Sequence, residues 1–257
     1  MDAEIHVEEH GSGPPLVLVH GLGGTGAAIW KKQVPELARE YRVVAFDLRG
    51  SGRSEVTPGP YAIDLHVRDL DDLLGQLDLD RAALAGHSMG GSIVLRYAAD
   101  RPERVAAAVV VGGPATFPNA VRAGLRARAD TVEAEGMAAV AETVATNGMA
   151  PGFRDANPEE LRAYVALLLA NDVRGYAAQC RGLAELDLEG DLPRIAAPVL
   201  LVGGDVDAVV PPGANERSAA SVPSCELHVL EGCGHIIPWE KPAELVALVR
   251  PFLDRHA

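Results

Sequence analysis

Short apolar runs recur along the chain and alternate with longer stretches whose apolar residues fall at helical spacing. Runs of this kind, flanked by glycine, proline or polar residues, are typical of strands buried on both faces of a parallel sheet. Such strands are predicted at residues 16–19, 42–46, 82–85, 105–111, 198–202 and 226–230. Residues 3–9 alternate apolar and polar positions instead, which predicts an edge strand.

Amphipathic helices are predicted between these strands. One of them carries an apolar stripe at steps of four, three, four and three: Ile63, Val67, Leu70, Leu74 and Leu77. Residues 27–40 and 245–253 also read as helices, and Pro251 is expected to kink or shorten the second. The alternation predicts right-handed βαβ units in a mostly parallel sheet flanked by helices, with functional residues at the carboxyl ends of the strands. The fold class is therefore α/β.

The pattern changes between residues 115 and 194. This segment is rich in alanine and arginine, has helical stretches at residues 132–146 and 159–169, and contains no strand-like run. We interpret residues 115–194, called the cap segment below, as a helical cap or lid. It is inserted into an α/β core that comprises residues 1–114 and 195–257.

The most specific chemical signal is a serine flanked by glycines, between a predicted strand and a predicted helix. Gly86-His87-Ser88-Met89-Gly90 follows the run at residues 82–85 and precedes a helical stretch at residues 92–99. The glycines let the helix pass close to the strand, so the serine can occupy a strained backbone position with its hydroxyl exposed. The free amides near Met89 can then stabilise an oxyanion beside Ser88. This is the environment that an acylating serine needs.

This stretch resembles the nucleophile elbow of the α/β-hydrolase fold family, and the resemblance extends along the whole chain. It implies a triad in the order serine, acid, histidine, with Ser88 as the nucleophile. His235 follows the strand at residues 226–230 in a glycine-rich loop, which is where the base belongs. The resemblance also implies an oxyanion hole formed by the backbone amides of Leu22 and Met89.

The acid is expected in the loop after the strand at residues 198–202. Asp205 and Asp207 both occur there. Asp205 directly follows two glycines and can instead bond the amides of its own turn. Asp207 stands four residues before Pro211, a spacing that is usual for the acid of this family. Asp207 is therefore the predicted triad acid.

Three further residues are assigned to substrate binding. His20 and His87 adjoin the predicted oxyanion loop and nucleophile, and they are expected to shape the pocket or to hydrogen-bond its loops. Trp30 either lines the pocket or fills the core, and the sequence leaves both readings open. No histidine or carboxylate pattern has the spacing of a metal site, so no metal and no cofactor are expected.

Composition narrows the choice of partner and compartment. The chain has 257 residues and a formal charge of −13, which disfavours nucleic acid and anionic membranes and favours a small-molecule ligand. A homo-oligomer is left open. With no secretory signal and no apolar run of membrane-spanning length, the protein is expected to be cytoplasmic. Cys180, Cys225 and Cys233 lack paired spacing and are expected to be reduced.

The cap sets substrate choice within this family. Residues 175–183, together with Asp187-Leu188 and residues 195–198, are similar to 3-oxoadipate enol-lactonases. In contrast, His87 and the pair His20-Gly21 are widespread among esterases and cofactor-free, haloperoxidase-like perhydrolases. We therefore predict a serine hydrolase of small esters or lactones. The alternatives are a perhydrolase, which accepts hydrogen peroxide in place of water, and a ligand-binding receptor module on the same fold.

A dicarboxylate lactone needs a local cation to offset the negative charge of the protein. Seven arginines of the cap segment are candidates for this role: Arg122, Arg126, Arg128, Arg154, Arg162, Arg174 and Arg181. Most are expected to be solvated on helix surfaces. The sequence does not indicate which of them points inward.

Overall fold

The computed structural model describes residues 2–257 and contains a seven-stranded sheet with the order β1-β3-β2-β4-β5-β6-β7. The strands are β1 (Val7–His10), β2 (Pro15–Val19), β3 (Arg42–Phe46), β4 (Ala82–His87), β5 (Val105–Val111), β6 (Val199–Gly204) and β7 (Cys225–Leu230). β1 pairs with β3 in antiparallel orientation, and the other neighbouring pairs are parallel. The predicted mostly parallel sheet is confirmed, and the carboxyl ends of its parallel strands share one edge.

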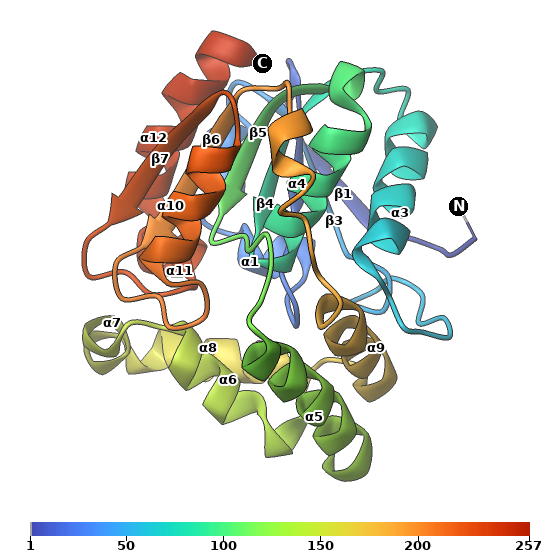
Figure 1. Ribbon diagram of the computed structural model, residues 1–257, viewed down its shortest axis with the longest axis vertical. Helices are drawn as coiled ribbons and strands as arrows, with labels where there is room; N and C mark the ends of the chain where they lie inside the picture. Colours follow the sequence, from blue (N-terminus) through green and yellow to red (C-terminus); the bar gives the residue numbers. More distant parts are fainter. Residues whose placement is uncertain (1) are drawn as a thin grey trace.

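Helices cover both faces of the sheet, which explains the unbroken apolar sequences of the central strands (Figure 1). Every residue of β4, β5 and β6 is buried. One face is covered by α3 (Ile63–Gln76), α4 (Met89–Asp100) and α10 (Pro212–Ser221). The other is covered by α1 (Gly26–Ile29), α2 (Val34–Leu37), α11 (Ile237–Glu240) and α12 (Pro242–His256).

The cap segment is helical and lies beyond the carboxyl ends of the strands, at the bottom of the view in Figure 1. Its helices are α5 (Asn119–Glu135), α6 (Ala141–Gly148), α7 (Pro151–Ala156), α8 (Pro158–Leu169) and α9 (Val173–Leu183). Within residues 115–194, extended pairing is limited to one isolated bridge between Thr116 and Asp187. The helices therefore face the sheet edge at which functional side chains are expected.

Three predicted helices differ from the structure. Residues 27–40 form two short helices, because the chain turns after Trp30 and Pro35 occupies the first turn of α2. Residues 132–146 are interrupted at Gly136, whose φ of 82° ends α5. Conversely, α12 continues through Pro251. This proline is exposed, so water can satisfy the carbonyl that its missing N–H leaves unpaired.

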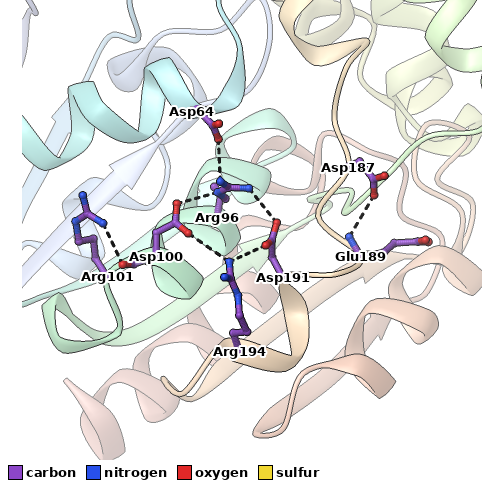
Figure 2. Close-up of polar contacts among 8 residues, drawn as sticks. All are labelled: Asp64, Arg96, Asp100, Arg101, Asp187, Glu189, Asp191 and Arg194. Atoms are coloured by element: carbon purple, nitrogen blue, oxygen red, sulfur yellow. Dashed lines mark hydrogen bonds and ion pairs between the residues drawn. The ribbon is translucent and has the colours of Figure 1, made fainter.

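An ion-pair cluster on α4 holds the connection that returns from the cap segment to β6 (Figure 2). The Arg96 guanidinium lies 3.0 Å from Asp191, 2.8 Å from Asp100 and 3.5 Å from Asp64. Arg194 also pairs with Asp191 and Asp100. These side chains are partly exposed, so each pair contributes about 0.2–1 kcal/mol. The cluster fixes the end of the cap segment to the core.

Other structural features concern membranes, metals and thiols. Within residues 2–257, none of the helices combines the length and apolar character needed to cross a bilayer. The same range contains no group of three or more His, Cys, Asp or Glu side chains that could hold a metal ion.

Cys180, Cys225 and Cys233 are free, and burial raises the pKa of each thiol. These thiols are therefore protonated at neutral pH.

Candidate active site

Ser88 stands at the sharp turn between β4 and α4, at the carboxyl edge of the sheet. Its backbone has φ 54° and ψ −121°, a region that non-glycine residues rarely occupy. The turn requires glycine at positions 86 and 90, where a side chain would clash. A Cβ on Gly86 would lie 2.2 Å from the carbonyl oxygen of Gly90, and one on Gly90 would lie 2.3 Å from that of Val19. The N–H of Ser88 donates to the carbonyl of Val111 at 2.8 Å. The half-buried Ser88 hydroxyl therefore faces out from the sheet edge.

His235 and Asp207 reach Ser88 from the loops after β7 and β6. His235 Nε2 lies 2.8 Å from Ser88 Oγ, and His235 Nδ1 lies 2.8 Å from Asp207 Oδ2. The other carboxylate oxygen of Asp207 accepts from the N–H groups of Val209 and Val210 at 2.7 and 2.8 Å. Because one oxygen is held by the backbone, the other is fixed toward the imidazole.

The Asp207 carboxyl is kept ionised despite its burial. Burial acts to raise its pKa, but the neighbouring His235 and the hydrogen bonds from His235, Val209 and Val210 lower it below the ordinary value. A carboxylate in this position selects the tautomer of His235 that carries its proton on Nδ1. That leaves Nε2 free to accept the Ser88 proton.

Asp205 lies in the same loop but does not contact the imidazole. Its carboxylate accepts a hydrogen bond from the N–H of Cys233 at 3.1 Å, and backbone hydrogen bonds from Gly232 and Cys233 lower its pKa. The expected bond to the amides of its own turn is thus accompanied by bonds to the loop that carries His235. Asp205 therefore joins the acid loop to the base loop.

The loop after β2, which is the predicted oxyanion loop, lies directly against Ser88. A Cβ on Gly21 would be 2.8 Å from the Cβ of Ser88, and Leu22 lines the same cavity as Ser88. The N–H of Leu22 forms no backbone hydrogen bond within residues 2–257. Met89 is the first residue of α4, so its N–H lacks an intrahelical acceptor. Both predicted donors thus adjoin Ser88.

His20 is placed behind the oxyanion loop and does not contact the cavity. Its Nε2 accepts from the N–H of Leu48 at 2.8 Å, so its Nδ1 carries the proton and donates to the Gly21 carbonyl at 2.8 Å. The ring is fully buried, and burial lowers its pKa. His20 was assigned to substrate binding with two possible roles, and the structure supports the hydrogen bonds to a loop and not a place in the cavity lining.

His87 lines the cavity, as predicted, and also braces the base loop. Its Nε2 donates to the carbonyl oxygen of His235 at 2.9 Å, while its Nδ1 has no hydrogen-bond partner within residues 2–257. Burial and the proximity of His235 lower the pKa of His87 to about 3. The ring is therefore neutral at physiological pH, and it is suited to packing rather than to proton transfer.

Trp30 does not line the cavity, which corrects its assignment to substrate binding. Its side chain is 2% exposed and belongs to the apolar layer that contains Leu37 and Leu253. The chain turns immediately after α1, and this turn directs the indole beneath the sheet. Of the two readings that the sequence left open, the structure supports the core position.

A buried carboxylate that sequence reasoning missed connects the base loop to the cap segment. Glu240 accepts from the N–H groups of Gly234 at 2.9 Å, Ile236 at 3.1 Å and Ala150 at 3.0 Å. Burial raises its pKa in spite of these bonds. The only signal in the sequence is an acidic residue within the apolar stretch just after His235.

A cavity of about 270 Å³ lies between the core and the cap segment. Ser88, His87 and His235 line it from the core. The cap segment contributes mainly apolar and aromatic side chains, among them Phe117, Leu125, Val144, Tyr164, Tyr176 and Leu183. A pocket of this size with few polar groups suits a small organic ligand.

Comparisons with known proteins agree with this fold. The alpha/beta hydrolase fold family matches residues 14–242. The chain is 33% identical to 3-oxoadipate enol-lactonase 2 of Acinetobacter baylyi over 242 residues, which cover 94% of this chain and 89% of that protein. The malate-bound structure of a thermophilic esterase from Thermogutta terrifontis has a TM-score of 0.94 and 30% identity, covering 99% of this chain and 95% of its own. A bromoperoxidase from Bacillus anthracis has a TM-score of 0.89 and 27% identity, covering 98% and 96%. The chain therefore belongs to the α/β-hydrolase fold family.

Proposed function

We propose that this protein is a serine hydrolase that cleaves small carboxylic esters or lactones through an acyl-enzyme. The observation that carries the proposal is the continuous hydrogen-bonded chain from Ser88 through His235 to Asp207, which begins at the cavity. Each member has the environment that its role requires: a strained and accessible hydroxyl, a base with a defined tautomer, and a buried carboxylate.

In the acylation step, Ser88 Oγ attacks the carbonyl carbon of the substrate while its proton moves to His235 Nε2. Asp207 stabilises the imidazolium that forms. The negative charge on the tetrahedral oxygen is met by the N–H groups of Leu22 and Met89, an arrangement in which one donor is worth about 10²–10³ in rate.

The intermediate then collapses, and His235 returns the proton to the departing oxygen. For a linear ester the alcohol leaves, whereas for a lactone the departing oxygen stays attached to the acyl group. A water molecule next transfers a proton to His235 and attacks the acyl carbon, which releases the acid and restores Ser88.

Within this class we infer an enol-lactonase-like activity and a cytoplasmic location. The activity is supported by the 33% identity to 3-oxoadipate enol-lactonase 2 over nearly the whole chain. The location is supported by the three free cysteines, since reduced thiols are the rule in that compartment.

The test is to compare the wild type with Ser88→Ala on p-nitrophenyl acetate and on a panel of lactones. We expect turnover by the wild type, labelling of Ser88 by a fluorophosphonate, and a fall in kcat of about 10³ or more in Ser88→Ala. A receptor module would bind ligands but show no turnover above the Ser88→Ala control. That result, or an adduct mapped to another residue, would contradict the proposal.

A perhydrolase is a second candidate, favoured by the structural similarity to the bromoperoxidase. In this reaction hydrogen peroxide attacks the acyl-enzyme in place of water, so the products are a peracid and free Ser88. Repeating the assay with acetate and peroxide, with peracid detected by bromide oxidation, separates the two candidates. Peracid formation that depends on Ser88 supports the perhydrolase.

A further inference from the structure

Arg128 is the one side chain with a permanent charge among those that line the cavity. It lies on α5 and is half-buried. The lining contains no Asp or Glu, and His87 is held neutral by its low pKa. The cavity therefore has a single fixed positive charge, which the cap segment contributes, whereas Ser88 is contributed by the core.

The other cap arginines are engaged elsewhere or exposed. Arg126 pairs with Glu185, Arg174 with Asp172, and Arg181 with Asp130 and Glu133. Arg122 and Arg154 donate to backbone carbonyls. Arg162 is exposed on α8. In contrast, Arg128 forms no ion pair with any residue in the range 2–257, so its counter-charge is missing.

The surroundings of Arg128 are polar but uncharged. The Tyr176 hydroxyl is fully buried, forms no well-shaped hydrogen bond within residues 2–257, and also lines the cavity. Burial raises the pKa of Tyr176, and the charge of Arg128 acts on the same phenol in the opposite direction. Asn147, on α6, also lines the cavity. A partly desolvated cation without a carboxylate partner is costly unless an anion binds there.

We propose that Arg128 binds a carboxylate carried by the substrate, so that the preferred esters or lactones are anionic. This inference rests on the proposed hydrolase function, and it adds that the substrate has a carboxylate in addition to the ester or lactone group that is cleaved. A planar monoanion matches the fork of one guanidinium, whereas a phosphate dianion would need a further cation. With a formal charge of −13, the protein otherwise repels anions, so Arg128 reverses the local field.

Binding is measured by calorimetry with Ser88→Ala protein, which cannot turn the ligand over. The two probes are a γ-lactone with a carboxymethyl substituent and its carboxamide, which have the same shape and differ in charge. We expect the carboxylate to bind about 10- to 100-fold more tightly, as charge-assisted hydrogen bonds do. Introducing Arg128→Met into the Ser88→Ala protein should bring the ratio of the two affinities close to one. Adding Arg126→Met, a matched change on the same helix, should leave it intact.

Equal affinity of the Ser88→Ala protein for the two probes overturns the proposal, whether or not any Arg128 variant folds. A preference that survives in folded Arg128→Met overturns it as well. Arg128→Lys keeps the charge but loses the planar fork, so it should retain part of the preference. Failure of the hydrolase proposal appears separately, as absence of p-nitrophenyl acetate turnover by the wild type. The binding ratio does not depend on that result.

Discussion

The backbone N–H of His235 lies 2.7 Å from the carbonyl oxygen of Gly148 and donates a hydrogen bond to it. Gly148 ends α6 in the cap segment, whereas His235 belongs to the core. Glu240 adds a second connection two residues further along the cap segment, at Ala150. The position of the base thus depends on how the cap segment is seated, so changes in the cap can alter the catalytic geometry as well as the pocket.

We predict that Glu240→Gln lowers kcat about tenfold and destabilises the fold by about 1–3 kcal/mol, because an amide NH₂ would replace one of two oxygens that both accept buried N–H groups. Fluorophosphonate should still label Ser88, but more slowly. The control is Glu244→Gln, an exposed residue that pairs with Lys241 on the surface. Wild-type values of kcat and denaturant midpoint in Glu240→Gln would show that Glu240 does not position the base loop.

The histidines near the nucleophile should separate into distinct roles. His235→Ala should reduce kcat about 10³-fold or more, because within residues 2–257 it removes the only base in hydrogen-bond contact with Ser88. His20→Ala should mainly lower stability, since it releases the oxyanion loop. His87→Ala should shift the substrate profile and retain most activity. Folding is checked by circular dichroism. An equal loss of kcat in folded His87→Ala and His235→Ala would contradict the separate roles assigned to these two histidines.

The strands and the elbow could be predicted because their causes are local. A strand buried on both faces needs an unbroken apolar sequence, and the approach of α4 to the sheet requires Gly86 and Gly90. The resemblance to the α/β-hydrolase fold family placed Ser88, Asp207 and His235 after the strands β4, β6 and β7, and the structure brings these three side chains together.

Side-chain directions set by tertiary packing could not be predicted. Arg128 and Arg126 lie two residues apart on α5, yet one lines the cavity and the other pairs with Glu185. The packing of the cap segment on the core decides which of the two arginines faces the cavity. Trp30 likewise turns into the core because of where the first helix ends. Such choices depend on contacts between distant segments, which a single sequence does not reveal.

Acid stability should depend on His66. The imidazole is fully buried on α3, neither ring nitrogen has a hydrogen-bond partner within residues 2–257, and the ring meets Tyr61 edge-on. Burial is the main cause that lowers its pKa to about 3, and the proximity of His20 and of the Arg49 guanidinium acts in the same direction. At pH 5 the unfolded chain binds a proton at this site and the native protein does not. The free energy of unfolding therefore decreases as the pH falls below about 6.5, which is the pKa of histidine in the unfolded chain.

His66→Phe should remove the part of this dependence that comes from His66, while the buried His20 and His87 keep theirs. Between pH 7 and pH 5, the free energy of unfolding should fall by about 2 kcal/mol less in the variant than in the wild type. Urea unfolding at both pH values measures the difference. His10→Phe, on the exposed edge strand, is the control and should behave as the wild type. An unchanged pH dependence in His66→Phe would show that the buried imidazole is not the source.

The last prediction concerns the triad acid. Asp207→Asn should lower kcat by about 10⁴, because an amide can present its NH₂ to His235 Nδ1 and so favour the wrong tautomer. Asp205→Asn should retain activity and lose stability, since its carboxylate bonds the N–H of Cys233 rather than the imidazole. The two variants are matched in chemistry and lie in one loop, so the kcat ratio isolates the contact with His235. Near-wild-type kcat in Asp207→Asn, with the loss appearing in folded Asp205→Asn, would assign the acid to the other carboxylate.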